Sequence, residues 1–368
     1  MTELSRRSFF SKSALLALGS GLCPGAFNLE ALAAAPKTSL ALADVLNMSD
    51  IDMAKQSTVV QASYRVILDA AKQIRNEELR SQTLAILENP APTIARGNEK
   101  NILDQLKKEK LVDADCVTVF PPVKDPGQSP QPFWSAPGSG YASHHAYPGG
   151  LATHTALNVV SALSLVKNYR DVNGLKLDYD AAIGGEILHD LHKPWVFAWQ
   201  DDHTCRKEQR LAGTGEHHVL SIAESIARKL PSEVIVAQAC AHEHPATPAG
   251  ERFVVGWLKA ASIIAGVDPI AYGLLDASGT TLPLPRRIEG WVVHLADHDF
   301  VISSSACQWS AKMLNTLAKE VYGLSDPQHL NAFRNYVLAN LTAMYLYGIL
   351  AANGEEAFAA EVARVVKK

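Results

Sequence analysis

Two adjacent residues, His189 and Asp190, offer metal-binding chemistry at one point of the chain. They lie at the end of an expected helix over residues 178–192, which Pro194 must stop because proline has no backbone N–H. A histidine nitrogen and a carboxylate oxygen are common metal ligands, and the two oxygens of Asp190 can bridge two ions. Neighbouring residues on a helix face different ways. Other segments of the chain must therefore supply the remaining ligands.

Lys193 follows this pair and permits two interpretations. Its ammonium group can bind a phosphate of a substrate. Alternatively, it faces the negative end of the helix dipole, as basic residues in the last turn of a helix often do. The sequence leaves both open.

Histidines are concentrated in one part of the chain, where they can complete a metal site. All 13 except His329 lie between His144 and His298, which a scatter of surface residues would not produce. Any one of them alone is more often a hydrogen-bonded core residue, but the ordered set favours metal binding. The candidate ligands in chain order are His154, His189, Asp190, His217 or His218, His242 or His244, and Asp297, with Asp268 as a rival for the last position.

The composition is that of a globular protein. The chain has 368 residues, of which 47% are hydrophobic and 20% charged, with a formal net charge of -4. This length is enough for one large core or two modest ones. The charge gives no reason to expect a nucleic-acid partner. Beyond the leader no apolar run reaches about 18 residues, so we expect no membrane span in the mature chain.

Residues 1–33 are typical of an export signal. Arg6 and Arg7, followed by Lys12, resemble the twin-arginine consensus, and small residues precede an expected cleavage after Ala33. A chance pair of arginines before an apolar helix is the alternative. We expect export to the periplasm by the twin-arginine machinery, a route that carries folded proteins, often with a cofactor bound. The four cysteines beyond this leader have no C-x-x-C spacing and are expected to be buried thiols or one optional disulfide.

Apolar residues recur at three- and four-residue steps along most of the chain, and no alternating strand pattern of any length is present. We therefore predict an all-α fold. Ser232 is the expected N-cap of one helix. Residues 117–150 are rich in proline and glycine and, with residues 195–216, are expected to wall a pocket. The expected helices cover residues 51–76, 77–87, 98–111, 149–169, 178–192, 216–230, 233–241, 251–265 and 289–303, with two or three more in 308–368.

Five local motifs in chain order resemble the HD-domain superfamily of metal-dependent phosphohydrolases. They are His144 to His154 (HHAYPGGLATH), His189 to Lys193 (HDLHK), Gly215 to His218 (GEHH), Ala241 to His244 (AHEH) and Glu289 to Asp297 (EGWVVHLAD). The resemblance covers roughly residues 140–305. It implies an HD-domain helical core over residues 140–307, preceded by a helical and proline-rich extension (34–139) and followed by C-terminal helices (308–368).

The resemblance also implies a ligand set. Within the paired histidines, His218 is preferred over His217 because it stands directly before an apolar run, and His242 over His244, which precedes Pro245. His192 stands where many members carry glycine, so it is expected to contact the metal shell or the substrate pocket. The implied ligands are His154, His189, Asp190, His218, His242 and Asp297, with His217, His244, Asp268 and His192 as less favoured candidates.

By this resemblance the chain is expected to be an exported phosphohydrolase that cleaves a phosphate ester or nucleotide. Two divalent ions (manganese, iron or zinc) would activate water, with Asp190 bridging them and Lys193 binding the phosphate. If only His154, His189, Asp190 and Asp297 bind metal, the site holds one ion. A mixed-valent di-iron oxygenase, similar to inositol oxygenases, would use the same six ligands. A third possibility is a helical binding protein whose metal is structural.

Overall fold

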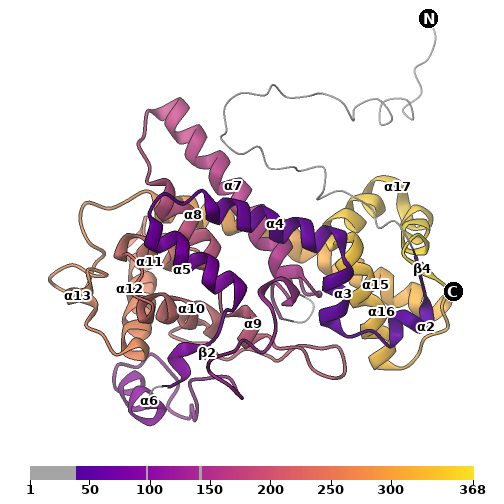
Figure 1. Ribbon diagram of the computed structural model, residues 1–368, viewed down its shortest axis with the longest axis horizontal. Helices are drawn as coiled ribbons and strands as arrows, with labels where there is room; N and C mark the ends of the chain where they lie inside the picture. The colour runs from indigo at the N-terminus through magenta and orange to yellow at the C-terminus, as the bar shows by residue number, and fades with distance from the viewer. Residues whose placement is uncertain (1–38, 97, 141–142) are drawn as a thin grey trace, which may run out of the picture.

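The computed structural model describes residues 39–368, except residue 97 and residues 141–142, and the described part is built almost entirely of helices (Figure 1). The strands in this part are each only two residues long. The predicted all-α fold is confirmed. The expected export signal over residues 1–33 lies outside the described residues.

The elements follow in three stretches, in which η marks a 3₁₀-helix. The first comprises β1 (Leu40–Ala41), α2 (Leu42–Leu46), α3 (Asp50–Gln56), α4 (Thr58–Lys72), α5 (Glu77–Glu88), η2 (Thr93–Arg96), α6 (Glu99–Lys108) and η3 (Phe133–Ser135). The second comprises α7 (Gly150–Asn173), α8 (Tyr179–Leu188), α9 (Lys193–Val196), β2 (Arg210–Leu211), β3 (Thr214–Gly215), α10 (Glu216–Ala227), α11 (Ser232–Ala239), α12 (Pro248–Ala265), α13 (Pro269–Tyr272), α14 (Glu289–Ala296) and η4 (Asp297–Asp299). The third comprises α15 (Phe300–Glu320), α16 (Pro327–Leu341), α17 (Ala343–Ala363) and β4 (Val366–Lys367).

Two segments expected as single helices are each divided, and in both places a polar residue marks the break. Ser57 separates α3 from α4, because its hydroxyl accepts the Val60 N–H at 3.1 Å and donates to the Ala339 carbonyl at 2.6 Å. The segment 289–303 holds α14, the tighter turn η4 and the start of α15. Asp297 lies at this second break, which frees its side chain from a regular helical face.

Helix α11 is capped differently from the expectation. It begins at Ser232, and Pro231 occupies the N-cap position. The prediction that Ser232 caps the helix is wrong, because its hydroxyl donates to the side chain of Glu233 at 3.4 Å instead. The helix packs closely on α8, where a side chain at Gly185 would meet Ala237 at 3.1 Å. This close approach brings the segment after α11 to the end of α8.

The core around the candidate ligands is formed by α4, α7, α8 and α14, which pack on one another with buried aliphatic side chains. Helices α10, α11 and α12 pack on one side of this group, and α15, α16 and α17 lie on the other (Figure 1). Because of this packing, the C-terminal ends of α8 and α14 finish inside the protein, where their terminal residues can meet.

Cys205, Cys240 and Cys307 are buried and carry free thiols.

The first and last parts of the described chain pack together. β1 pairs in parallel with β4, with Leu40 opposite Val366. Helices α2 and α3 pack on α16, while α4 packs on α7. The predicted boundary between residues 307 and 308 falls within α15. Among the described helices none alone is long and apolar enough to cross a membrane, and α16 and α17, bent by 85°, pass this test only as a pair.

A buried ion pair joins α3 to the segment after α9. His203, which has a φ of 62°, lies with its Nδ1 2.9 Å from Asp50 Oδ2. Asn335 of α16 donates to Asp50 Oδ1 at 2.8 Å and to the His203 carbonyl at 2.9 Å. The hydrogen bond to Asp50 raises the pKa of His203 above its ordinary value, although burial opposes this. The pair thus links three segments that are distant in sequence.

The raised pKa of His203 predicts a pH-dependent contribution to stability. The pair stabilises the fold fully below the unfolded-state histidine pKa of about 6.5 and ceases to do so as pH rises through the folded-state pKa. Asp50→Asn retains an acceptor for Asn335 and should lower the free energy of unfolding by about 1–2 kcal/mol near pH 6, and by less near pH 9. Urea unfolding measures this, with the exposed Asp44→Asn as control. An equal loss at both pH values contradicts the ion pair.

Candidate metal centre

The ends of several helices bring the candidate ligands to one place. His154 lies in α7, His189 ends α8, and Asp297 ends α14. His217 lies in the first turn of α10, and His242 follows α11. The candidate ligands come from segments that span more than a third of the chain, so only the packing of these helices brings them together.

A first group of atoms surrounds the oxygens of two carboxylates. The Nε2 atoms of His154 and His189 lie 3.1 and 3.3 Å from Asp297 Oδ1. The same two nitrogens lie 3.4 and 3.2 Å from Asp190 Oδ2. All four side chains are buried. Two imidazole nitrogens and two carboxylate oxygens therefore converge on one point.

A second group faces the other oxygen of Asp190. Asp190 Oδ1 lies 3.5 Å from His217 Nε2, and His242 Nε2 lies 3.8 Å from Asp297 Oδ2. Ligand atoms of Asp190, His217 and His242 lie within 4.8 Å of one another. Asp190 thus stands between the two groups with one oxygen toward each, as a bridging carboxylate requires.

In the structure His217, and not the preferred His218, has a nitrogen that faces Asp190. His218 Nε2 lies 3.2 Å from the Ala239 carbonyl, and its ring stacks on that of His242 with centroids 4.1 Å apart. Successive residues of an α-helix point about 100° apart, so only one of the two histidines can face Asp190. The apolar run after His218 therefore belongs to the buried side of α10, and His217 becomes the favoured candidate ligand.

The three remaining candidate ligands lie away from the centre. His192 Nε2 is 3.2 Å from a glutamate of α10. Asp268 caps the short helix α13 with its carboxylate. His244 faces the ring of His294 at 4.8 Å, whereas His242, the preferred residue of that pair, faces the candidate centre. The placement of the two histidines follows from the turn after α11, which points them in different directions.

The second nitrogen of each histidine nearest Asp190 is held by a neighbouring oxygen. Such outer contacts orient imidazole ligands and fix which nitrogen faces the metal. They place Nε2 of each ring toward the carboxylates. The Nδ1 contacts are His154 to Asp299 Oδ1 at 3.0 Å, His189 to the Glu186 carbonyl at 2.6 Å, and His217 to Glu208 Oε2 at 2.5 Å.

Sequence reasoning did not identify the two carboxylates in this outer layer. Asp299 lies two residues after Asp297, and the tight turn of η4 directs both toward His154. Glu208 lies in the segment before α10 that was expected to wall the pocket. The acidic pair around residue 298 was an available signal for Asp299. No local pattern marks Glu208, because only the β2–β3 turn brings it next to its partner His217.

Opposite charges balance each other in the centre. Burial by itself raises the pKa of a carboxyl, but His189 and Lys193 hold the pKa of Asp190 well below its usual range. Burial lowers the pKa of His154, yet Asp299, Asp190 and Asp297 outweigh it and raise that pKa to about 10. Burial and the adjacent His218 hold the pKa of His242 well below its usual range. The carboxylates and imidazoles of the centre thus strongly perturb one another's pKa values.

Several buried polar atoms in this centre lack a hydrogen-bond partner within the described chain. They are His189 Nε2, Asp190 Oδ1 and His217 Nε2, while Asp190 Oδ2 makes only ion pairs, among them one to Lys193. Buried polar groups normally make hydrogen bonds, so each such atom calls for an explanation. These are the same atoms that converge between the two groups. A nitrogen and carboxylate donor set of this kind suits manganese, iron or zinc.

Lys193 is buried and makes two contacts. Its Nζ lies 2.5 Å from Asp190 Oδ2 and donates to the Gly138 carbonyl. The lysine thus points toward the candidate centre. The alternative interpretation, in which it faces the helix dipole at the surface, does not describe its position. Both contacts hold the ammonium group beside the carboxylate that divides the two groups.

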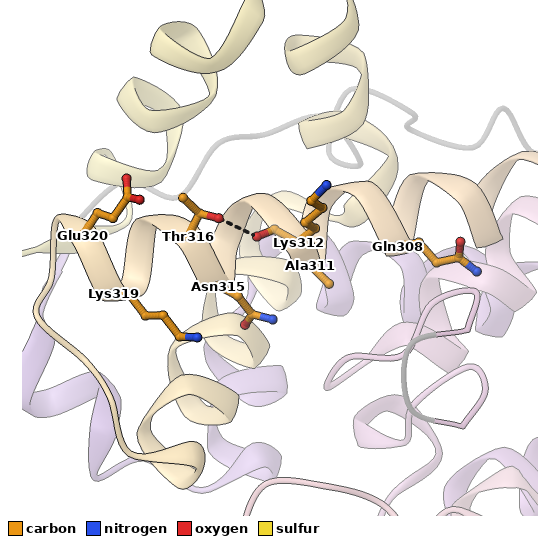
Figure 2. Close-up of a pocket in the computed structure, with 7 residues that line it drawn as sticks. All are labelled: Gln308, Ala311, Lys312, Asn315, Thr316, Lys319 and Glu320. Atoms are coloured by element: carbon orange, nitrogen blue, oxygen red, sulfur yellow. Dashed lines mark hydrogen bonds between the residues drawn. The ribbon is translucent and has the colours of Figure 1, made fainter.

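A separate surface pocket contains none of the candidate ligands. It is lined by residues of α15 alone, among them Gln308, Asn315 and Lys319 (Figure 2). Thr316 in this pocket donates to the Lys312 carbonyl of its own helix at 3.3 Å. The residues that line this pocket all come from one helix and bring no candidate ligands together.

Comparison with curated proteins finds a similar enzyme. The chain is 26% identical over 292 residues to the dihydroneopterin 2',3'-cyclic phosphate phosphodiesterase of Methanocaldococcus jannaschii, covering 78% of this chain and 90% of the relative. No family model matches the chain. No solved structure matches it either. The similarity spans most of both chains.

The geometry predicts different outcomes for the two adjacent histidines. His217→Ala should lower the affinity for Mn²⁺ by at least about 10–100-fold, because it removes a nitrogen that faces Asp190. His218→Ala removes a ring beside the centre and should change this affinity less. Calorimetric titration of both variants measures the difference, with circular dichroism to establish that each is folded. A larger loss in His218→Ala would reverse the assignment.

Proposed function

We propose that this chain is a metal-dependent phosphohydrolase of the HD-domain type that hydrolyses a phosphodiester in a small substrate. The observation that carries the proposal is the division of the Asp190 carboxylate, with one oxygen toward His154 and His189 and the other toward His217. The similarity to a cyclic phosphate phosphodiesterase supports hydrolysis as the use of this centre.

In this proposal the chain holds two divalent ions. Asp190 lies between both positions, which distinguishes the arrangement from a site for one ion. When bound, such ions lower the pKa of a coordinated water and neutralise charge on the phosphoryl oxygens. Lys193 can turn its ammonium group from Asp190 toward a substrate phosphate and so orient it. His154, His189, Asp297 and Asp190 would hold the first ion, and Asp190, His217 and His242 would hold the second.

The same ligands would also serve a di-iron oxygenase or a structural metal site. The buried Lys193 beside Asp190 favours an anionic substrate over either. The curated relative is named as a phosphodiesterase, which adds support for hydrolysis. Oxygen uptake and metal content separate these possibilities by direct measurement.

Hydrolysis of a cyclic phosphodiester tests the proposal. The full chain, loaded with Mn²⁺, should open a 2',3'-cyclic nucleotide to a phosphomonoester, measured by chromatography. Asp190→Ala should lower kcat/KM on the order of 10³-fold, because it removes the carboxylate common to both ion positions. His329→Ala, an exposed histidine far from the centre, is the control. Full activity of Asp190→Ala, or oxygen consumption by the iron-loaded chain without ester cleavage, would contradict the proposal.

We also propose that the chain is exported to the periplasm by the twin-arginine route. The support is sequence alone: Arg6 and Arg7 precede an apolar run and small residues ending at Ala33. Replacing both arginines by lysine should retain the protein in the cytoplasm at its full length, measured by cell fractionation and N-terminal sequencing. Lys12→Arg is the matched control. Cleaved, exported protein from the double variant would contradict this route.

A further inference from the structure

A second cluster of potential ligands lies on the far side of His154 from Asp190. His144 and His145 precede α7, and Asp299 follows Asp297 in η4. The ring centroids of His144 and His145 lie 5.0 and 5.2 Å from that of His154. One ligand nitrogen from each of these three histidines lies within 4.8 Å of the others. Neither His144 nor His145 takes part in the pair of ion positions around Asp190.

Asp299 supplies a negative charge to this cluster. Its Oδ1 accepts from His154 Nδ1 at 3.0 Å, and its Oδ2 lies 3.6 Å from His145 Nε2. Asp299 Oδ2, His144 Nδ1 and His145 Nδ1 are buried and have no hydrogen-bond partner within the described chain. A carboxylate oxygen and neutral imidazole nitrogens are electron-pair donors. A carboxylate oxygen with imidazole nitrogens is also a donor set that divalent cations take in proteins, whereas Asp299 would repel an anion.

The backbone holds the two histidines in place. His145 has a φ of 52°, a conformation that non-glycine residues rarely adopt and that is often found at functional sites. Its carbonyl accepts the N–H groups of Gly138 and Tyr147, each at 2.9 Å. A side chain on Gly150 would meet this carbonyl at 1.9 Å, so the loop closes only because that residue is glycine. The strained position directs the His145 ring toward Asp299.

We propose that His144, His145 and Asp299 form an additional divalent cation site beside the two positions around Asp190. His154 separates the sites: its Nε2 faces Asp190 and Asp297, while its Nδ1 bonds to Asp299. The additional ion would add positive charge next to the proposed phosphate position.

Metal content measured for matched variants tests this site. The full chain is stripped with a chelator, dialysed against Mn²⁺ at concentrations up to the millimolar range and analysed for manganese per chain. The double variant His144→Ala/His145→Ala should bind one ion fewer than the natural chain. His329→Ala is the control and should bind the same number as the natural chain. Equal manganese content in the double variant and the natural chain would overturn the proposal and leave water as the occupant.

A second variant guards against loss of the fold. Asp299→Asn keeps an acceptor for His154 Nδ1 while removing the negative charge, and it should also bind one ion fewer. Circular dichroism and thermal unfolding establish that each variant is folded. Asp190→Ala tests the two positions around Asp190. Unchanged manganese content in this variant would contradict the proposed hydrolytic centre. The manganese content of the His144→Ala/His145→Ala variant decides the additional site separately. Full manganese content in a folded Asp299→Asn protein would overturn the additional site.

Discussion

Two buried carboxylates, Asp190 and Asp297, are the constraint on which the rest of the structure depends. Charges taken out of water are unfavourable unless opposite charges or ions balance them. His154, His189 and Lys193 provide part of that balance. Because these groups belong to different segments, the ends of α8 and α14 and the interior of α7 must meet at one point.

Close packing makes this meeting possible. Because Gly185 has no side chain, α8 approaches α11 so closely that an added Cβ would lie 3.1 Å from the Ala237 side chain. This approach brings His242 beside the end of α8. Helix α4 covers α7, and the first and last segments close on each other through β1 and β4 (Figure 1). The segments outside residues 140–305 therefore pack around and support the part of the chain that resembles the HD-domain superfamily.

The outer contacts divide the histidines into defined roles. Glu208 holds His217, Asp299 holds His154, and the peptide carbonyl of Glu186 holds His189. These bonds direct one nitrogen of each ring toward Asp190 and fix the orientation of the rings. Asp299 uses Oδ1 to hold His154 and directs Oδ2 toward His145. Asp299 therefore lies between the proposed hydrolytic centre and the proposed additional cation site.

The sequence by itself determined the helical class and the ordered set of histidines and aspartates, since helical periodicity and the adjacency of His189 and Asp190 are local properties. It could not determine which of His217 and His218 faces Asp190, because that depends on the rotation of α10, which packing against α12 sets. The partners Glu208 and Asp299 and the inward direction of Lys193 likewise depend on segments distant in sequence. Tertiary packing alone decides which donors share a buried space.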